Sequence, residues 1–255
     1  MREITGVLSN TERHAQMQKA IATGFPFLQK RESFHENRCS LVCYGPSLLD
    51  TWRMVKPLEN SIITVSGAHD FMVDRNIIAT YHVEIDPRPH KAKMLRSPRE
   101  ETRYLMASCC HSDFWPKLAD HDVQLWHLIN GDDKETGKWV AEHHREGLAS
   151  MIGGGSTVGL RAMNVAAALG FRRFAIFGMD CSFNVERHAG GHTGEPEPER
   201  RVWCGGRLFR TTPQLLQAAR EMARLLVTMD VECEFYGDGL MQELARQLQK
   251  RKANA

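Results

Sequence analysis

Residues 40–47 read Ser-Leu-Val-Cys-Tyr-Gly-Pro-Ser, an apolar run followed by a tight turn and then by Leu48. A run of this length fits a short buried strand, and Ser47 is placed to be the N-cap of a helix that follows the turn. The same succession of strand, turn and helix recurs along the chain. We expect strands at 40–44, 61–65, 81–85, 103–107, 123–128, 173–177 and 231–235. We expect a mainly helical arm at 10–31, whose helix Gly24 and Pro26 end or kink, and further helices at 48–55, from about 68, at 156–169 and at 213–229.

Continuous apolar strands that alternate with helices are typical of a parallel sheet with both faces covered. The predicted fold class is therefore α/β, a Rossmann-like, mostly parallel sheet with helices on both faces and an N-terminal helical arm. We expect residues 1–38 to form the arm and a linker, and 39–255 to form one Rossmann-like domain. Residues 10–31 could serve as a dimerisation arm. A polar loop is expected between the fifth strand and the helix at 156–169.

The composition limits the partners and the compartment. The chain has 255 residues with a net charge of +2, a balance that favours no nucleic-acid partner. No stretch approaches the roughly 18 apolar residues of a membrane span, and the N-terminus has no signal-peptide core. The 7 cysteines contain no Cys-x-x-Cys pair, so we expect reduced thiols and a cytoplasmic protein.

Ligands of open parallel sheets bind beyond the carboxyl ends of the strands. The residues that follow the predicted strands are rich in Gly, Ser and Asp: Gly45, Pro46 and Ser47; Ser66 and Gly67; Asp86; Ser108; and Gly178, Asp180 and Ser182. Such residues populate turns in any protein, but together they predict a polar ligand site at one edge.

Residues 153–157, Gly-Gly-Gly-Ser-Thr, lead directly into the helix predicted at 156–169. Gly154 and Gly155 would let the backbone approach a ligand, and a helix N-terminus favours phosphate. Ser156 or Thr157 would cap the helix or donate to the phosphate. No Lys follows the glycines, so this is not a Walker A loop. The alternative is a flexible loop with an ordinary N-cap.

Two carboxylates are candidate Mg²⁺ ligands. Asp180 and Asp86 each follow a predicted strand, and Mg²⁺ favours one or two carboxylates together with ligand phosphates. Asp86 could instead bind a ribose hydroxyl, and Arg88 or Arg187 could neutralise phosphate charge. A structural turn is the competing interpretation of Asp86.

Histidines lie in a polar segment at 188–200, which could be a lid over the ligand. His188 is a candidate general acid or base. Cys181, His188, His192 and Cys204 could ligate zinc, but their spacing fits no common zinc module. A solvated loop with incidental histidines is the other interpretation.

The motifs taken in order resemble those of the 6-hydroxymethylpterin diphosphokinase MptE-like family, a Rossmann-type group. The residues that carry the resemblance are 44–48, 65–68, 81–89, 154–158, 170–171 and 176–183. The resemblance implies a Mg²⁺-dependent transferase that moves a pyrophosphoryl group from ATP, as co-substrate, to a hydroxymethyl acceptor. It also implies nucleotide contacts by Gly45, Ser47, Gly154, Ser156 and Thr157, and metal or ribose contacts by Asp86 and Asp180.

The same pattern is similar to that of bacterial sialyltransferases that use CMP-sugars. One departure concerns the first turn, where members often have Gly-Asn before Gly-Pro-Ser and this chain has Cys43 and Tyr44. The missing Asn removes a side chain expected to touch the nucleotide or the reacting group. Three functions follow. The first is a diphosphokinase-like transferase acting on a nucleotide and a small-molecule acceptor, the second is a glycosyltransferase that uses a CMP- or UDP-sugar with His188 as base, and the third is a nucleotide-sensing module without turnover.

Overall fold

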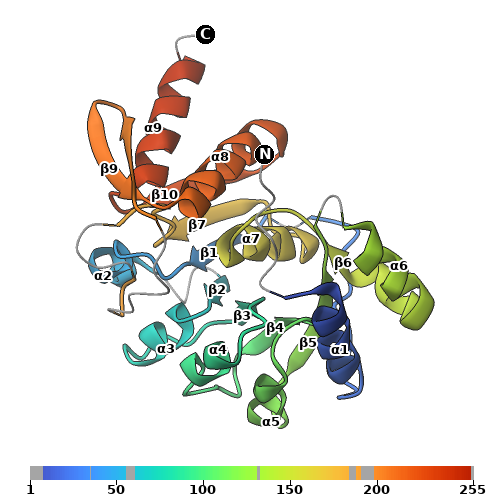
Figure 1. The fold of residues 1–255 in the computed structure, drawn as a ribbon. Helices are drawn as coiled ribbons and strands as arrows, with labels where there is room; N and C mark the ends of the chain where they lie inside the picture. The colour runs from blue at the N-terminus through green and yellow to red at the C-terminus, as the bar shows by residue number, and fades with distance from the viewer. Residues whose placement is uncertain are drawn as a thin grey trace.

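The computed structural model has a central sheet of eight parallel strands with helices around it (Figure 1). It describes residues 8–34, 36–55, 61–130, 133–183, 188–190 and 198–253. The predicted α/β Rossmann-like fold is thereby confirmed, including a helix near the N-terminus.

The strands are β1 (Arg38–Val42), β2 (Ser61–Val65), β3 (Tyr81–Glu84), β4 (Arg103–Ala107), β5 (Val123–Leu128), β6 (Met151–Ile152), β7 (Arg173–Phe177), β8 (Arg200–Cys204), β9 (Arg207–Thr211) and β10 (Glu232–Tyr236). The α-helices are α1 (Asn10–Ile21), α2 (Leu48–Thr51), α3 (Ala68–Val73), α4 (Pro89–Met94), α5 (Trp115–Leu118), α6 (Lys134–His143), α7 (Val158–Ala168), α8 (Pro213–Thr228) and α9 (Leu240–Ala253). Short 3₁₀ helices lie at Trp52–Met54, Ser112–Phe114 and Arg145–Ser150.

The strand order places a topological switch at the centre of the molecule. The sheet runs β10-β7-β1-β2-β3-β4-β5-β6, and its neighbouring strands are parallel. The chain therefore builds outward from β1 to β6, and then returns to the other side of β1 to add β7 and β10. Ligands of such sheets bind where the order reverses, which here is the carboxyl edge between β1 and β7.

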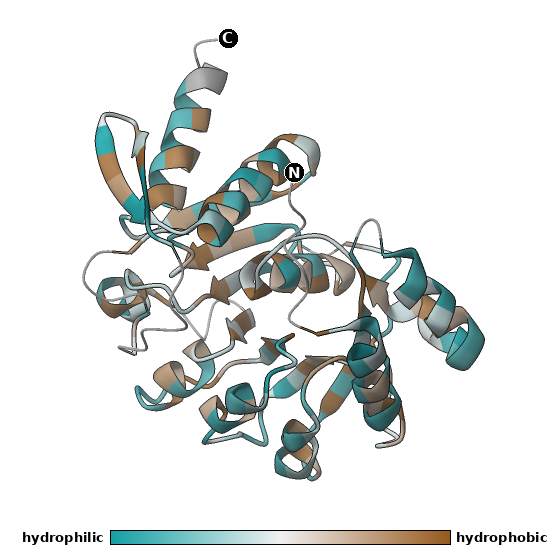
Figure 2. Cartoon of the chain, viewed as in Figure 1, coloured by the Kyte–Doolittle hydropathy of each residue, from teal (hydrophilic) through white to brown (hydrophobic). Residues whose placement is uncertain are grey.

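Successive apolar residues of each strand enter opposite layers of the core, because side chains alternate along a strand. Leu41 packs in the layer that contains residues of α7, whereas Val42 packs in the layer with α3. Ile63 and Ile62 of β2 divide in the same way. Figure 2 shows the resulting apolar strands at the centre and polar residues on the outer helices.

Helix α1 is packed onto the body of the protein. Met17 is 1% exposed and packs in the core layer that also contains Leu41 of β1. Arg13 forms an ion pair of 2.6 Å with Asp133 at the start of α6, and the His14 ring stacks on Trp139 at 5.1 Å. The chain then adds a bridge from Phe27 to β5. A role of this segment in dimerisation stays a prediction.

The structure corrects several predicted elements. The expectation of a polar loop between β5 and α7 is wrong, because that stretch contains α6, a 3₁₀ helix and β6. The first helix ends at Ile21, just before the expected end or kink at Gly24, which has a left-handed φ of 75°. The antiparallel β8–β9 hairpin was not predicted. The first strand begins two residues earlier than expected, at Arg38.

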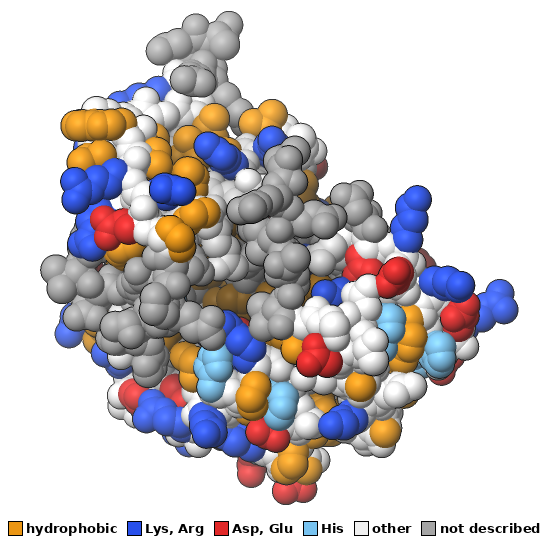
Figure 3. Space-filling model, viewed as in Figure 1, with side chains coloured by type: hydrophobic (Ala, Val, Ile, Leu, Met, Phe, Trp, Pro, Cys, Tyr) orange, Lys and Arg blue, Asp and Glu red, His pale blue; other side chains and the backbone are white. Residues whose placement is uncertain are grey.

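No helix in the described part of the chain is long and apolar enough to span a membrane. On the face seen in Figure 3, basic and acidic side chains are interspersed. This mixture agrees with the small net charge of +2.

Candidate active site

The turn after β1 and the turn after β7 meet at the switch point. Gly45 N donates to Gly178 O at 2.8 Å, which continues the pairing of β1 with β7 beyond the strands. A side chain at Gly45 would collide with Gly178 O and with the Asp180 carboxylate. Glycine is therefore required at 45, and the predicted Gly45, Pro46, Ser47 turn lies directly against Asp180.

Asp180 organises this turn. Its side chain is buried, and its carboxylate accepts hydrogen bonds from Ser47 N at 2.8 Å, from the Ser47 hydroxyl and from Gln242 Nε2 at 3.1 Å. Burial raises the pKa of Asp180, and the hydrogen bonds from Ser47 and Gln242 oppose that rise. Asp180 thus holds the backbone of the Gly45-Pro46-Ser47 turn in place through its hydrogen bonds to Ser47.

The start of α9 completes the same corner, and sequence reasoning did not find it. Ser182 Oγ accepts the Leu240 N–H at 2.9 Å, and Met241 N donates to Asp180 O at 3.0 Å. Gly237 has φ 111° and lies against the Ser47 side chain. The position of the predicted site residue Ser182 is therefore set by α9. In the sequence, the Gly-Asp-Gly turn at 237–239 after the last predicted strand is the feature that could have indicated this part of the site.

The glycine-rich loop leads from the end of β6, where Gly153 lies against Ile129, into α7. Gly154 and Gly155 have φ of 85° and 89°, conformations that L side chains rarely adopt. A side chain on Gly159, in the first turn of α7, would meet Cys43 Sγ at 2.9 Å and Met179 Cε at 3.0 Å. The helix N-terminus thus points into the edge that also holds the Gly45 turn.

Thr157 takes the N-cap position of α7, but its side chain makes no capping hydrogen bond. Ser156 N donates instead to Glu221 Oε2 of α8 at 2.7 Å. The hydroxyl of Ser156 is buried and has no hydrogen-bond partner in the described residues. The sequence-based expectation that Ser156 or Thr157 caps α7 through its side chain is thus wrong, whereas donation to a phosphate stays a prediction.

His188 lies beside the first turn. Its ring stacks on Tyr44 with centroids 5.7 Å apart and an interplanar angle of 10°. Ala189 N donates to Tyr44 O at 3.1 Å, and a side chain at Gly67 would collide with the Tyr44 ring. Burial raises the pKa of the Tyr44 phenol. The structure therefore brings His188 and Gly67 together through Tyr44.

Asp86 and Arg88 lie further along the sheet, after β3, which β2 separates from β1. Arg88 donates from Nε at 2.9 Å to Asp86 Oδ1 and from a terminal nitrogen at 2.6 Å to Oδ2. Burial by itself would raise the pKa of Asp86, but the hydrogen bonds from Arg88 and the charge of Lys91 lower it overall. Asp86 and Asp180 are thus not brought together as one carboxylate pair.

These contacts do not fit a magnesium site built on Asp86 and Asp180, because each carboxylate is engaged through both oxygens by protein donors. Among the described residues no group of three or more His, Cys, Asp or Glu side chains could hold a metal ion. His192 and Arg187 lie outside the described residues, as does most of the predicted lid. Magnesium binding stays a prediction.

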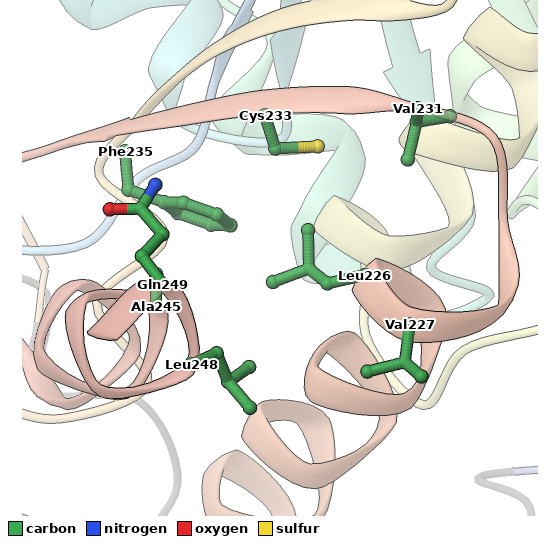
Figure 4. A pocket seen from close by; sticks show the side chains of 8 residues that line it. All are labelled: Leu226, Val227, Val231, Cys233, Phe235, Ala245, Leu248 and Gln249. Carbon is green, nitrogen blue, oxygen red and sulfur yellow. The ribbon is translucent and has the colours of Figure 1, made fainter. Parts of the chain in front are cut away.

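A pocket of about 140 Å³ opens between α8, β10 and α9, away from these loops (Figure 4). It is lined by Leu226, Val227, Val231, Cys233, Phe235, Ala245, Leu248 and Gln249. None of these side chains carries a charge, so the pocket does not fit the phosphates of a nucleotide.

The profile of the family described as 6-hydroxymethylpterin diphosphokinase MptE-like matches residues 11–186, more than half of the chain. The chain belongs to this family. The family takes its name from a diphosphokinase, which is a transferase, so membership supports a transferase. No curated protein matches the sequence.

Two solved structures are similar in fold. The structure of the MAf glycosyltransferase from Magnetospirillum magneticum AMB-1 aligns with a TM-score of 0.67 and 16% identity, over 95% of this chain and 42% of that chain. The chain thus spans less than half of that protein. A mammalian sialyltransferase, crystallised with Gal-beta-1-3GalNAc-ortho-nitrophenol, aligns with a TM-score of 0.46 and 9% identity, over 88% of this chain and 79% of that chain.

Proposed function

We propose that the chain is a glycosyltransferase that binds a nucleotide-sugar at the carboxyl edge between β1 and β7. The observation that carries this proposal is the meeting of three loops at the switch point: the Gly45 turn, the Asp180 turn and the glycine-rich entry to α7. Backbone N–H groups and a helix N-terminus are suited to phosphate.

Two observations favour a sugar as the transferred group. The fold likeness to a glycosyltransferase covers 95% of the chain, including elements beyond residue 186, where the family match ends. In addition, the carboxylates of Asp86 and Asp180 accept hydrogen bonds from protein donors, which favours a reaction without a carboxylate-bound metal.

The proposed reaction uses His188 as general base. The imidazole would take the proton of an acceptor hydroxyl as that oxygen forms a bond to the anomeric carbon. The bond from the anomeric carbon to the phosphate oxygen breaks, and the nucleotide leaves with the electron pair. Tyr44, stacked on the ring, would hold His188 in position.

The test is release of nucleotide from UDP-, GDP- and CMP-sugars, with and without EDTA. We expect turnover with one of them in EDTA, and a fall of about 10²–10⁴-fold in kcat for His188→Ala with little change in donor Kd. Turnover restricted to ATP, Mg²⁺ and a hydroxymethyl acceptor would overturn the sugar proposal.

The second candidate is the diphosphokinase-like reaction, which the family match over residues 11–186 favours. It requires Mg²⁺-dependent binding of ATP. In that reaction the carboxylate of Asp180 or Asp86 would exchange one of its present hydrogen-bond donors for the metal ion. Ligand-induced stabilisation with no product from any donor would instead support a sensing module.

A further inference from the structure

Arg161 of α7 is a buried cation that sequence analysis did not single out. It is 5% exposed, and its guanidinium donates to Ile129 O at 2.7 Å and to Asn130 Oδ1 at 2.5 Å, both just after β5. Within the described ranges no carboxylate forms an ion pair with it. A buried charge without a close counterion is costly, which makes it a candidate binding group for an anion.

A carboxylate of the protein itself contacts the glycine-rich loop. Glu221 of α8 accepts the Ser156 N–H at 2.7 Å, and Gln217 Nε2 donates to its other oxygen at 2.9 Å. A carboxylate therefore occupies a backbone N–H at the entrance to α7, where the helix dipole favours negative charge. The buried, unpartnered hydroxyl of Ser156 lies at the same point.

Arg161 lies beside the glycine-rich loop, because Ile129 O, which accepts its hydrogen bond, is also 3.7 Å from the position that a Cβ on Gly153 would take. Burial lowers the pKa of Arg161, Cys109 and then Glu221 oppose that shift, and the charge of Arg13 adds to it. The two groups differ in exposure, since Arg161 is buried and bonded to the residues after β5, whereas Glu221 is partly exposed. Of the two, the carboxylate is therefore the one in contact with solvent.

We propose that Glu221 is an internal anion that occupies the glycine-rich loop until the phosphate of a nucleotide ligand displaces it, and that Arg161 supplies the positive charge that the phosphate then uses. This inference rests on the proposed nucleotide site and adds an exchange of anions to it. On binding, Ser156 N–H passes from the carboxylate to a phosphate oxygen, and Glu221 turns to solvent.

The test is calorimetric titration of the full chain with UDP, inorganic pyrophosphate and uridine at neutral pH. Glu221→Gln keeps the shape of the side chain but removes the competing charge, so we expect about 3- to 10-fold tighter binding of UDP and pyrophosphate and unchanged binding of uridine. Arg161→Gln should weaken both anions at least 10-fold, and Arg161→Lys should recover part of that loss. Glu142→Gln, an exposed glutamate of α6 paired with Lys138, is the matched control and should change nothing.

The outcomes separate this inference from the proposed function. Unchanged or weaker binding of UDP and pyrophosphate to a folded Glu221→Gln variant would overturn the exchange while leaving the nucleotide site intact. Tighter binding of pyrophosphate with no binding of any nucleotide would support the exchange and remove the nucleotide function. Thermal unfolding of each variant checks folding, and Glu221→Gln keeps the test valid if Arg161→Gln does not fold.

Discussion

Ser47 and Asp180 show at the scale of single residues how the site is assembled. They are 133 residues apart in the chain, yet Asp180 holds both the amide and the hydroxyl of Ser47. Sequence reasoning placed both at strand ends, because Gly, Pro, Ser and Asp after apolar runs mark turns. It could not identify Gln242 and Glu221, which lie inside helices and gain their partners only through tertiary packing.

Gly45→Ala should destabilise the chain by about 1–3 kcal/mol, because the new methyl group would collide with Gly178 O and the Asp180 carboxylate. Urea unfolding followed by circular dichroism measures the change. The matched control is Gly137→Ala within α6, where the nearest atom is Met151 Cε at 3.7 Å and alanine should stabilise by about 0.5–1 kcal/mol. Equal effects of the two substitutions would contradict the tight turn.

At the scale of elements, the apolar strands of the central sheet were predicted, whereas α6 and the β8–β9 hairpin, which have mostly polar residues, were not. Both layers of the core need apolar residues from β1, β2 and β7, so these strands stand out in the sequence. Helix α6 was missed although Asp133 caps it through Thr136 N, because only Thr136, Trp139 and Val140 of its residues are buried. The β8–β9 hairpin has a Gly-Gly turn, with φ of 57° and 78° at Gly205 and Gly206, a signal that the sequence did offer.

Helix α1 provides the prediction at this scale. Met17 is 1% exposed in the main core, so Met17→Ala should lower the free energy of unfolding by about 2–5 kcal/mol. Gln18→Ala on the exposed side of the same helix should change it by less than about 0.5 kcal/mol. A Met17→Ala variant as stable as the parent would mean that α1 is a detachable arm and not part of the body.

The whole molecule is defined by its strand order, which the sequence could not reveal. Alternating strands and helices predict a parallel sheet, but nothing local to residues 173–177 says that β7 pairs with β1 and not with β6. That single choice creates the switch point and brings residues 45–47, 157–159 and 178–182 together. The class of fold was predictable, whereas the composition of the site depended on this pairing.

Stability of the whole chain should fall as the pH falls from about 6.5 toward 3. His127 is fully buried, and its burial, together with the neighbouring His144, lowers the pKa of its imidazole from 6.5 to about 3. Because the folded pKa is depressed, the unfolded chain binds the proton first, and this group's stabilisation is complete above pH 6.5 and is lost on acidification. The slope expected from it is about 1.4 kcal/mol per pH unit.

Urea unfolding of the parent chain and of His127→Asn between pH 7.5 and 4.5 measures that slope. Below about pH 6.5, the variant should lose about 1.4 kcal/mol per pH unit less than the parent as the pH falls, and above it the two profiles should run parallel. Parallel pH profiles of the two proteins would show that His127 does not carry this dependence.

The most direct measurement of the central claim is hydrogen exchange of the backbone amides, read by mass spectrometry, with and without the nucleotide that binds best. A nucleotide at the switch point should slow exchange in peptides that cover 43–49, 153–161 and 178–183, and leave those around the apolar pocket at 226–235 unchanged. Protection confined to the apolar pocket or to the Asp86 loop, with none at the three meeting loops, would contradict the account.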